Sequence, residues 1–228
     1  MTVVDHCRFQ IGKCKKIHFI RVDVTDLSDT ILDIISSLND LSWINKFDKN
    51  YKKESFLSRA KPTANFLSSQ LLNNKEDRIT EETGEYIVSE LSRKSIIQEL
   101  DYLSIPLSEL LGRKMTGNPG FDFFTVNGCN TILFGEAKYL SNQNAYGKAF
   151  SQVVKFISLE KDMADLKLID DFCNDDALDK ASKGGKGYAI GFSAKNDHTE
   201  KLIKNIKRNK DFQNLLTYEE IIIVAVNI

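Results

Sequence analysis

Short β-rich runs alternate with helical periodicity in the C-terminal half of the chain, and this order constrains the fold most. The last run, 220–226, is almost continuously apolar, which is typical of a strand buried on both faces. The predicted elements are strands at 121–126 and 131–139, a helix at 146–159, a strand at 188–192, a helix at 200–207 and a strand at 220–226. This order predicts an α/β fold in which helices flank a mixed four-stranded sheet.

The N-terminal third predicts a hairpin followed by helices. Polar and apolar residues alternate on both sides of Gly12, which favours a β-hairpin. The predicted elements are strands at 7–11 and 17–24 and helices at 28–41, 52–72 and 80–100, with a break or kink at Pro62. We therefore expect an N-terminal hairpin and helical subdomain at 1–78 and a core at 79–228.

The balance of charge limits the classes of function. The chain has 31 Lys+Arg against 32 Asp+Glu, a formal net charge of −1, so it does not coat nucleic acid by bulk electrostatics. No apolar run approaches the ~18 residues of a spanning helix, and 1–10 leads into no apolar signal-peptide core. We expect a cytoplasmic protein with no membrane partner.

Histidines and cysteines cluster near the start of the chain. His6, Cys7, Cys14 and His18 are spaced more loosely than zinc ligands usually are, and we expect ordinary core and surface roles on the hairpin instead. The 4 cysteines of the chain are too few and too scattered for a disulfide framework, which favours free thiols in a reducing compartment.

The segment 118–139 carries the residues that suggest chemistry. Asp122 begins the first strand, and Glu136 and Lys138 end the second strand, two residues apart and so on one face. A three-residue loop at 128–130 places Asp122 directly opposite Glu136, with Cβ atoms about 5 Å apart, and a four-residue loop at 127–130 shifts the pairing by one. Two carboxylates and one ammonium group therefore meet at the end of this hairpin.

Two opposed carboxylates need a compensating cation. Mg²⁺ prefers hard oxygen ligands and often binds only one or two carboxylates, with waters and substrate phosphate completing its shell. Such an ion polarises a phosphoryl oxygen and helps to form hydroxide, while Lys138 stabilises developing charge or orients the attacking water. The pattern is typical of phosphodiester hydrolysis.

The surrounding sequence distinguishes Glu136-Ala137-Lys138 from an acid-x-Lys match that arises by chance. A second acid-x-Lys match, Asp165-Leu166-Lys167, lies in an acidic helical stretch without a partner hairpin, and we interpret it as a solvated face. The first match has a glycine shortly before Asp122, a hairpin of matching register with strands on both sides, and a helix directly after it. The alternative is an ordinary cross-strand ion pair at a strand end.

The same residues resemble the core of the PD-(D/E)xK nuclease superfamily. Asp122, thirteen intervening residues and then Glu136-Ala137-Lys138 match its motif, except that the first part reads Gly-Phe-Asp, with Pro119 three residues before the acid. The resemblance covers roughly 80–228. It implies that Asp122 and Glu136 bind Mg²⁺ or Mn²⁺ and that Lys138 supports the nucleophile.

Many members of this superfamily also use a glutamate on the helix before the core. The resemblance implies Glu85 as this further catalytic and metal-binding residue, with Glu82 as the fallback. The alternative for either residue is an ordinary acid near a helix N-terminus.

A narrower resemblance extends over most of the chain. The segments TGEYIVSEL (83–91), GRKM (112–115), PGFDFF (119–124) and ILFGEAKY (132–139) are similar to the nuclease subunits (HamA) of Hachiman anti-phage defence systems. This resemblance implies DNA as substrate and an ATP-dependent superfamily 2 helicase as partner. The N-terminal third matches only in pattern.

Two other functions fit the same residues. One is a stand-alone restriction or repair endonuclease with the same core. The other is a non-catalytic, nuclease-like binding or assembly module whose carboxylates bind no metal.

Charge is distributed unevenly after the motif. Residues 160–179 hold eight acids and two lysines, whereas 180–210 hold nine Lys+Arg and two acids. The near-neutral total is therefore a cancellation, which fits a nuclease whose DNA is delivered by a partner. The candidate substrate contacts are Gln152, Lys183, Lys186, Lys204 and Lys207.

Overall fold

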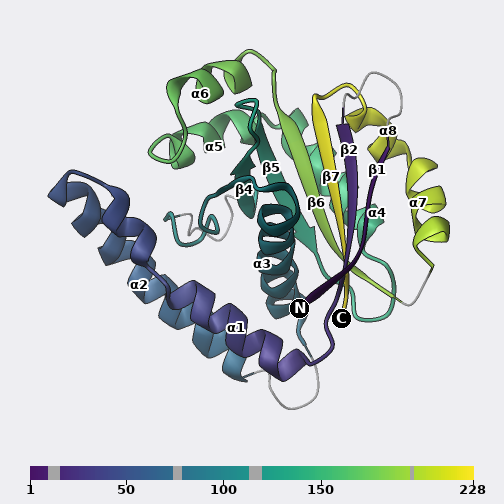
Figure 1. Cartoon of the computed structure of the whole chain (residues 1–228), viewed down its shortest axis with the longest axis horizontal. Coiled ribbons are helices and arrows are strands. Elements are labelled where there is room, and N and C mark those ends of the chain that lie inside the picture. The colour runs from purple at the N-terminus through teal and green to yellow at the C-terminus, as the bar shows by residue number, and fades with distance from the viewer. Residues whose placement is uncertain (10–15, 74–78, 113–119, 196–197) are drawn as a thin grey trace.

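The chain folds around one curled, mixed, seven-stranded sheet (Figure 1). The computed structural model describes residues 1–9, 16–73, 79–112, 120–195 and 198–228. The strand order across the sheet is β1-β2-β7-β6-β5-β4-β3. The strands are β1 (Thr2–Phe9), β2 (Lys16–Asp23), β3 (Leu103–Ser104), β4 (Phe123–Val126), β5 (Ile132–Lys138), β6 (Gly187–Ala194) and β7 (Glu220–Asn227).

The predicted α/β class with flanking helices is confirmed, but the sheet has seven strands where the sequence predicted four. Strands β4 to β7 are the four predicted ones. The N-terminal hairpin adds β1 and β2, because β2 pairs in parallel with β7 from Lys16↔Glu220 to Asp23↔Asn227. The two-residue strand β3 pairs with β4 at the other edge. The predicted turn around Gly12 and the thiol of Cys14 lie outside the described residues.

The sheet crosses the expected boundary between the two units. Strands β1 and β2 precede residue 78, and the other five strands follow it. The division at 78 and 79 stays a prediction, with the hairpin and the core sharing one sheet.

Nine helices are found in the described residues. They are α1 (Leu27–Asn39), the 3₁₀ helix η1 (Ser42–Lys46), α2 (Asn50–Asn73), α3 (Glu81–Leu100), α4 (Tyr146–Ser158), α5 (Lys161–Ile169), α6 (Asp175–Ser182), α7 (Thr199–Lys207) and α8 (Lys210–Leu215). The five predicted helices correspond to α1, α2, α3, α4 and α7. Helix α2 continues through Pro62, so the predicted break is absent; its buried residues Ala60, Ala64 and Leu67 are packed into the core on both sides of the proline.

Helices α3 and α4 cover the sheet from opposite sides, with α3 in front and α4 behind in Figure 1. Helix α3 contacts β5, β6 and β7, and α4 contacts β5 and β6. Glycine permits the close approach of α3, because a Cβ on Gly191 of β6 would lie 2.3 Å from Ser92 Oγ. The first turn of α3 and the end of β5 are thereby held at a fixed separation.

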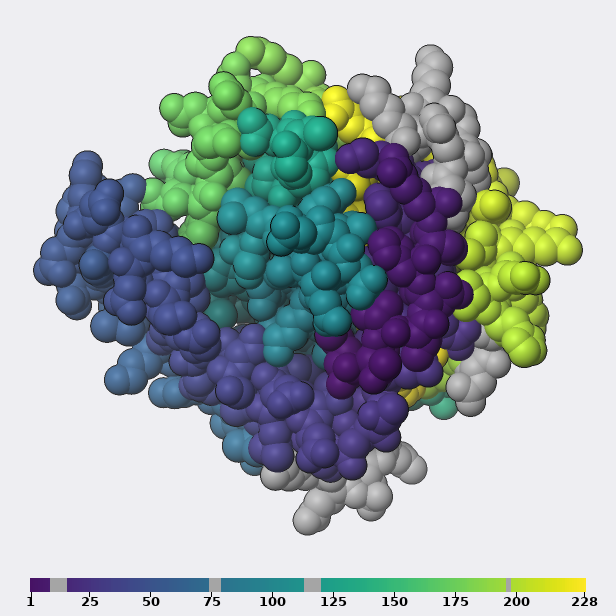
Figure 2. Space-filling model, viewed as in Figure 1, coloured from purple at the N-terminus to yellow at the C-terminus, as the bar shows by residue number. Residues whose placement is uncertain are grey.

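One face of the molecule shows the hairpin beside the core. In Figure 2 the purple surface of β1 lies next to the teal surface that includes α3, and the blue helices α1 and α2 extend to the lower left. None of the helices in the described ranges is long and apolar enough to cross a membrane.

Candidate active site

The hairpin β4–β5 has the register that brings the motif acids together. Phe123 pairs with Gly135 and Val126 with Ile132, and Asn127 N–H donates to Thr131 O at 3.1 Å. The loop therefore occupies residues 128–130, the three-residue alternative. One further step along this register places Asp122 opposite Glu136, as that alternative predicts.

The backbone fixes Asp122 at the mouth of the hairpin. Its N–H donates to Gly135 O at 2.8 Å, and its carbonyl accepts from Ser108 N–H at 2.9 Å. Its carboxylate Oδ2 accepts from Ala137 N–H at 2.7 Å, so the side chain turns toward β5. The carboxylate thus lies beside the backbone between Glu136 and Lys138.

Lys138 joins two carboxylates. Its Nζ lies 2.9 Å from Glu136 Oε1 on the same strand and 3.0 Å from Glu85 Oε1 on α3. The side chain of Lys138 is 18% exposed, so the ammonium group is partly open to solvent. These ion pairs link the end of β5 to the N-terminal part of α3.

Glu136 is buried and only half satisfied. The residue is 2% exposed, and its Oε2 is a buried oxygen that accepts no hydrogen bond from the described residues. Burial raises the pKa of the Glu136 carboxyl well above its usual range, and the charge of Asp122 raises it further, whereas Lys138 opposes both. A carboxylate in this position is costly without a further cation.

Burial and neighbouring charges also shift the pKa values of Lys138 and Glu85. Burial lowers the pKa of Lys138, but the charges of Glu136, Asp122 and Glu85 outweigh it and raise the pKa above its ordinary value. Lys138 therefore keeps its positive charge at neutral pH. Burial also raises the pKa of Glu85, against the lowering effect of Lys138.

The structure brings Glu85, and not Glu82, to Lys138. Glu82 accepts a hydrogen bond of 3.4 Å from Tyr86 Oη on the exposed side of α3. Gly84 lets the helix reach the strand, since a Cβ at that position would lie 2.2 Å from the ring of Tyr139. The Gly-Glu pair at 84 and 85 thus places its acid near the motif.

The donor set can be compared with the needs of a hard divalent cation. No three His, Cys, Asp or Glu side chains surround a common metal position in the part of the chain that the structure describes. Mg²⁺ often takes only one or two carboxylates, and Asp122 and Glu136 supply two. Oε2 of Glu136 accepts no hydrogen bond from the described residues, so its lone pairs can bind such an ion. The chemistry of these donors therefore fits a two-carboxylate site, with Glu85 held by Lys138.

Two of the predicted substrate contacts, Lys183 and Lys186, lie away from this group. Lys183 pairs with Asp179, and Lys186 is 9% exposed and pairs with the buried Asp162. Both lysines precede β6, whereas Lys138 pairs with Phe192 near its other end. The five steps from Gly187 to Phe192 span about 16 Å. Their contact with DNA stays a prediction, and Asp162 is the partner that the structure gives Lys186.

Helices α7 and α4 carry the remaining candidates. Lys204 and Lys207 lie in the last turn of α7, and the charge of Lys207 acts on Cys7 of β1, four strands from β5. Gln152 is half-buried in the middle of α4. The role of these three residues as substrate contacts stays a prediction.

Sequence reasoning missed two residues that shape the site. Asp165 is 3% exposed, and its Oδ2 accepts from Phe121 N–H at 3.0 Å, directly before Asp122. The interpretation of this acid as part of a solvated face was wrong, because α5 packs on α4 and carries Asp165 inward. Tyr86 is the second: burial raises the pKa of its phenol, and the charges of Glu109, Glu82 and Asp122 raise it further. No local signal in the sequence identifies either residue.

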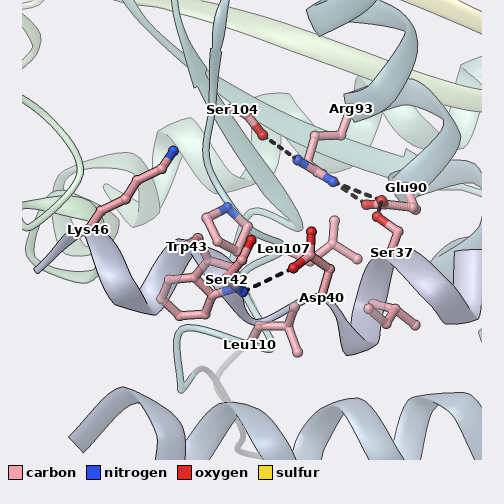
Figure 3. Close-up of a pocket in the computed structure, with 12 residues that line it drawn as sticks. Ser37, Asp40, Ser42, Trp43, Lys46, Glu90, Arg93, Ser104, Leu107 and Leu110 are labelled. Atoms are coloured by element: carbon pink, nitrogen blue, oxygen red, sulfur yellow. Dashed lines mark hydrogen bonds and ion pairs between the residues drawn. The ribbon is translucent and has the colours of Figure 1, made fainter. Parts of the chain in front are cut away.

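The expectation of free thiols is confirmed for Cys7, Cys129 and Cys173. A separate pocket of about 220 Å³ lies between α1, η1 and the segment after α3 (Figure 3). Trp43, Lys46 and Arg93 are among its lining residues, and Asp122, Glu136 and Lys138 are not. The motif acids therefore form a site distinct from this pocket.

Comparison with protein-family models, with curated proteins and with solved structures finds no match.

Proposed function

We propose that the chain is a metal-dependent DNA nuclease of the PD-(D/E)xK kind, acting as the effector subunit of a helicase–nuclease anti-phage complex. The observation that carries this proposal is the buried Glu136, one oxygen of which lacks a hydrogen bond, next to Asp122 and the charged Lys138. A buried, half-satisfied carboxylate is costly for stability, and such cost is typical of functional sites.

Each residue of the site has its own proposed role in phosphodiester hydrolysis. Bound Mg²⁺ or Mn²⁺ would polarise the phosphoryl oxygen and lower the pKa of an attacking water. Asp122 and Glu136 would hold this ion. Lys138 stays protonated and so stabilises negative charge at the phosphate or orients water, but does not serve as the base. Glu85 positions Lys138 through their ion pair.

The finer parts of the proposal rest on resemblance and charge. The motif order and the hairpin register support the PD-(D/E)xK assignment. The similarity of 83–91, 119–124 and 132–139 to HamA supports a superfamily 2 helicase partner. The formal net charge of −1 supports delivery of DNA by that partner. A stand-alone restriction or repair endonuclease is the alternative within the same chemistry.

One observation favours a non-catalytic module. The Lys138 ammonium already lies between Glu85 and Glu136, as in a structural ion-pair network. In that case the carboxylates bind no metal and the fold serves for assembly.

Cleavage of DNA by matched lysine variants tests the proposal. The chain, alone and co-purified with the product of the adjacent gene, is incubated with duplex and single-stranded DNA, Mg²⁺ and ATP. We expect Lys138→Ala and Glu136→Gln to lose cleavage by at least 100-fold, about the effect of removing one charge-stabilising group. The control is Lys167→Ala, which alters the second acid-x-Lys match at a side chain that is 89% exposed, and it keeps wild-type cleavage.

The outcomes separate the alternatives. Cleavage only with the helicase supports the defence complex, and equal cleavage without it supports a stand-alone nuclease. Metal-dependent cleavage retained by folded Glu136→Gln contradicts the assignment of the site.

A further inference from the structure

A buried aspartate on α5 faces the chain directly before the motif acid Asp122. Asp165 is 3% exposed, and its Oδ2 accepts a hydrogen bond of 3.0 Å from Phe121 N–H, 44 residues earlier in the chain. Aspartate is among the residue types that are least often buried at this depth. The contact therefore joins α5 to the entrance of β4 through a polar group inside the core.

Phe121 lies beyond the end of the β4–β5 pairing. Strand β4 begins at Phe123, and Asp122 N–H makes the next hydrogen bond to β5, at 2.8 Å from Gly135 O. The ring of Phe121 is fully buried among aromatic side chains of β5, α4 and β6, at centroid distances of 5.2 to 5.8 Å. A backbone N–H in such apolar surroundings is costly without an acceptor, and Asp165 supplies one.

The Asp122 carboxylate occupies an acceptor position at the end of β5. Backbone groups of alternate residues point to the same side of a strand, so Ala137 N–H points to the side on which Gly135 pairs with β4. The carboxylate Oδ2 of Asp122 accepts from this N–H at 2.7 Å. It therefore caps β5 where the pairing with β4 has ended, and a small shift of Asp122 would break this hydrogen bond.

We propose that Asp165 is a positioning residue, which holds the Asp122 carboxylate in place through the Phe121 peptide. This role rests on the proposed function, in which Asp122 binds a metal ion. The Cα atoms of Phe121 and Asp122 lie about 3.8 Å apart across one planar peptide. Asp165 fixes the N–H of Phe121, and Ser108 N–H fixes the Asp122 carbonyl at 2.9 Å. The direction of the Asp122 side chain is thus set from both sides.

A second buried acid anchors the same helix at β6. Asp162 is 2% exposed and lies three residues before Asp165, so both acids are on the same side of α5. Asp162 Oδ2 accepts from Tyr188 Oη at 2.6 Å. Tyr188→Phe removes this buried hydrogen bond and keeps the acceptor of Phe121 N–H. It is therefore the matched control for a general weakening of the contact between α5 and the sheet.

Amide hydrogen exchange of the full chain, measured by nuclear magnetic resonance, tests this role without metal. Ala137 N–H reports the position of the Asp122 carboxylate, because that carboxylate is its acceptor. In Asp165→Ala we expect Ala137 to exchange about tenfold faster relative to the amides of β7, which corresponds to the loss of one hydrogen bond. Asp165→Asn keeps an acceptor oxygen and should restore slow exchange. Tyr188→Phe should leave the ratio as in the wild type.

Binding of Mn²⁺ connects the position of Asp122 to the proposed function. Titration of the same proteins should show about tenfold weaker binding in Asp165→Ala, which is the effect of removing an outer hydrogen-bond partner of a metal site. Asp165→Asn and Tyr188→Phe should bind Mn²⁺ as the wild type does.

The outcomes separate this role from the assignment of the metal site. Unchanged Ala137 exchange in folded Asp165→Ala, or equal acceleration in Tyr188→Phe, overturns the role of Asp165. If Asp165→Ala does not fold, Asp165→Leu, which fills the space and lacks an acceptor, is measured with the same expectation. A wild type that binds no Mn²⁺ contradicts the proposed function, whereas the exchange of Ala137 still decides the role of Asp165.

Discussion

Two buried glutamates of this protein have opposite surroundings. Glu90 on α3 is 1% exposed and Glu136 on β5 is 2% exposed, so both have left water almost completely. Both contact a basic side chain within 3 Å. They differ in how many of their lone pairs are used.

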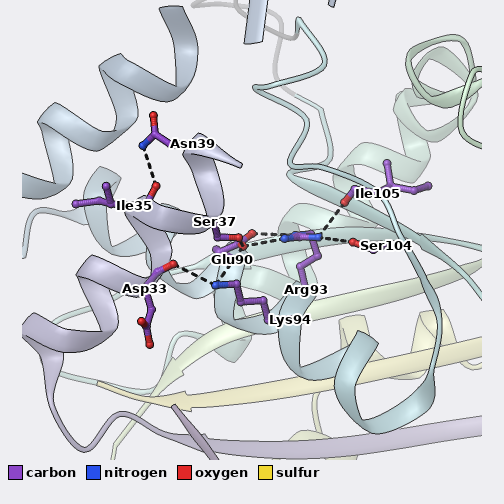
Figure 4. Close-up of polar contacts among 9 residues, drawn as sticks. All are labelled: Asp33, Ile35, Ser37, Asn39, Glu90, Arg93, Lys94, Ser104 and Ile105. Carbon is purple, nitrogen blue, oxygen red and sulfur yellow. Dashed lines mark hydrogen bonds and ion pairs between the residues drawn. The ribbon is translucent and has the colours of Figure 1, made fainter. Parts of the chain in front are cut away.

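Glu90 is fully engaged (Figure 4). Arg93 binds both of its oxygens at 2.8 Å, and Ser37 Oγ donates to Oε1 at 2.6 Å. Arg93 also donates to Ser104 Oγ and Ile105 O, so the network ties α1 and α3 to the edge of the sheet. Burial alone raises the pKa of Glu90, but Arg93, Ser37 and Lys94 outweigh it and hold that pKa below its ordinary value.

Glu136 has one ammonium partner and one unsatisfied oxygen, and its pKa is raised. The same residue type at the same depth is therefore stabilised as an anion in one place and destabilised in the other. Complete hydrogen bonding indicates a structural role for Glu90, whereas the deficit at Glu136 supports the proposal that a cation binds there. Equivalent substitutions at both positions can test this contrast.

Glu90→Gln should have the largest effect. It removes the charge from a buried pair and leaves Arg93 without its counter-ion, so we expect the free energy of unfolding to fall by about 3 kcal/mol. Urea unfolding followed by circular dichroism measures the change. An unchanged midpoint would show that the network contributes nothing.

Gly84→Ala should have the next largest effect, through the contact that places Glu85 near Lys138. The added Cβ would lie 2.2 Å from the Tyr139 ring, and relief of this overlap should cost about 2 kcal/mol of unfolding free energy. Gly147→Ala on α4 is the control, since no atom lies within 4 Å of its new Cβ. That variant should be neutral or slightly more stable.

Glu136→Gln should have the opposite sign to Glu90→Gln. It removes the charge that burial and Asp122 oppose, so we expect a gain of about 1 kcal/mol in the free energy of unfolding near pH 8 without added metal. Urea unfolding of the two glutamine variants side by side measures both signs. A loss of unfolding free energy equal to that of Glu90→Gln would show that the protein stabilises both glutamates as anions.

The gain from Glu136→Gln should depend on pH. Because the folded-state pKa of Glu136 is raised, the native protein binds this proton more tightly than the unfolded chain does. The wild-type residue therefore contributes fully below the unfolded pKa of about 4.3, and its contribution falls as pH rises through the folded pKa. The difference between variant and wild type should vanish below about pH 4 and grow with rising pH. A difference that is independent of pH would contradict the raised pKa.

Local sequence patterns predicted the individual helices and strands better than they predicted which strands pair when they are far apart in the sequence. The Asn-Gly loop at 127–130 and the β-rich runs on both sides of it predicted the β4–β5 register among two alternatives, and the helix predicted at 80–100 is α3. The parallel pairing of β2 with β7 joins segments about 200 residues apart, which periodicity does not encode. That pairing is why a four-stranded sheet was predicted and seven strands were found.

The sequence predicted that Asp122, Glu136 and Lys138 meet at one end of a hairpin, but not how deeply each side chain is buried. The spacing of Glu136 and Lys138 placed them on one face, and the structure adds the ion pair between them. Burial could not be predicted from local charge. Asp162 lies in a segment that looks acidic and solvated, yet it is 2% exposed because Tyr188 and Lys186 bind its carboxylate.

The location of bound Mn²⁺ tests the central claim most directly. Mn²⁺ prefers carboxylate and water ligands and broadens the nuclear magnetic resonance signals of nearby nuclei. Titrated into the labelled full chain, it should first broaden the amide signals of Ala137 and Lys138, and this effect should be lost in Glu136→Gln and kept in Lys167→Ala. Broadening that is equal in Glu136→Gln, or that avoids the end of β5 in the wild type, would contradict the assignment of Asp122 and Glu136 as metal ligands.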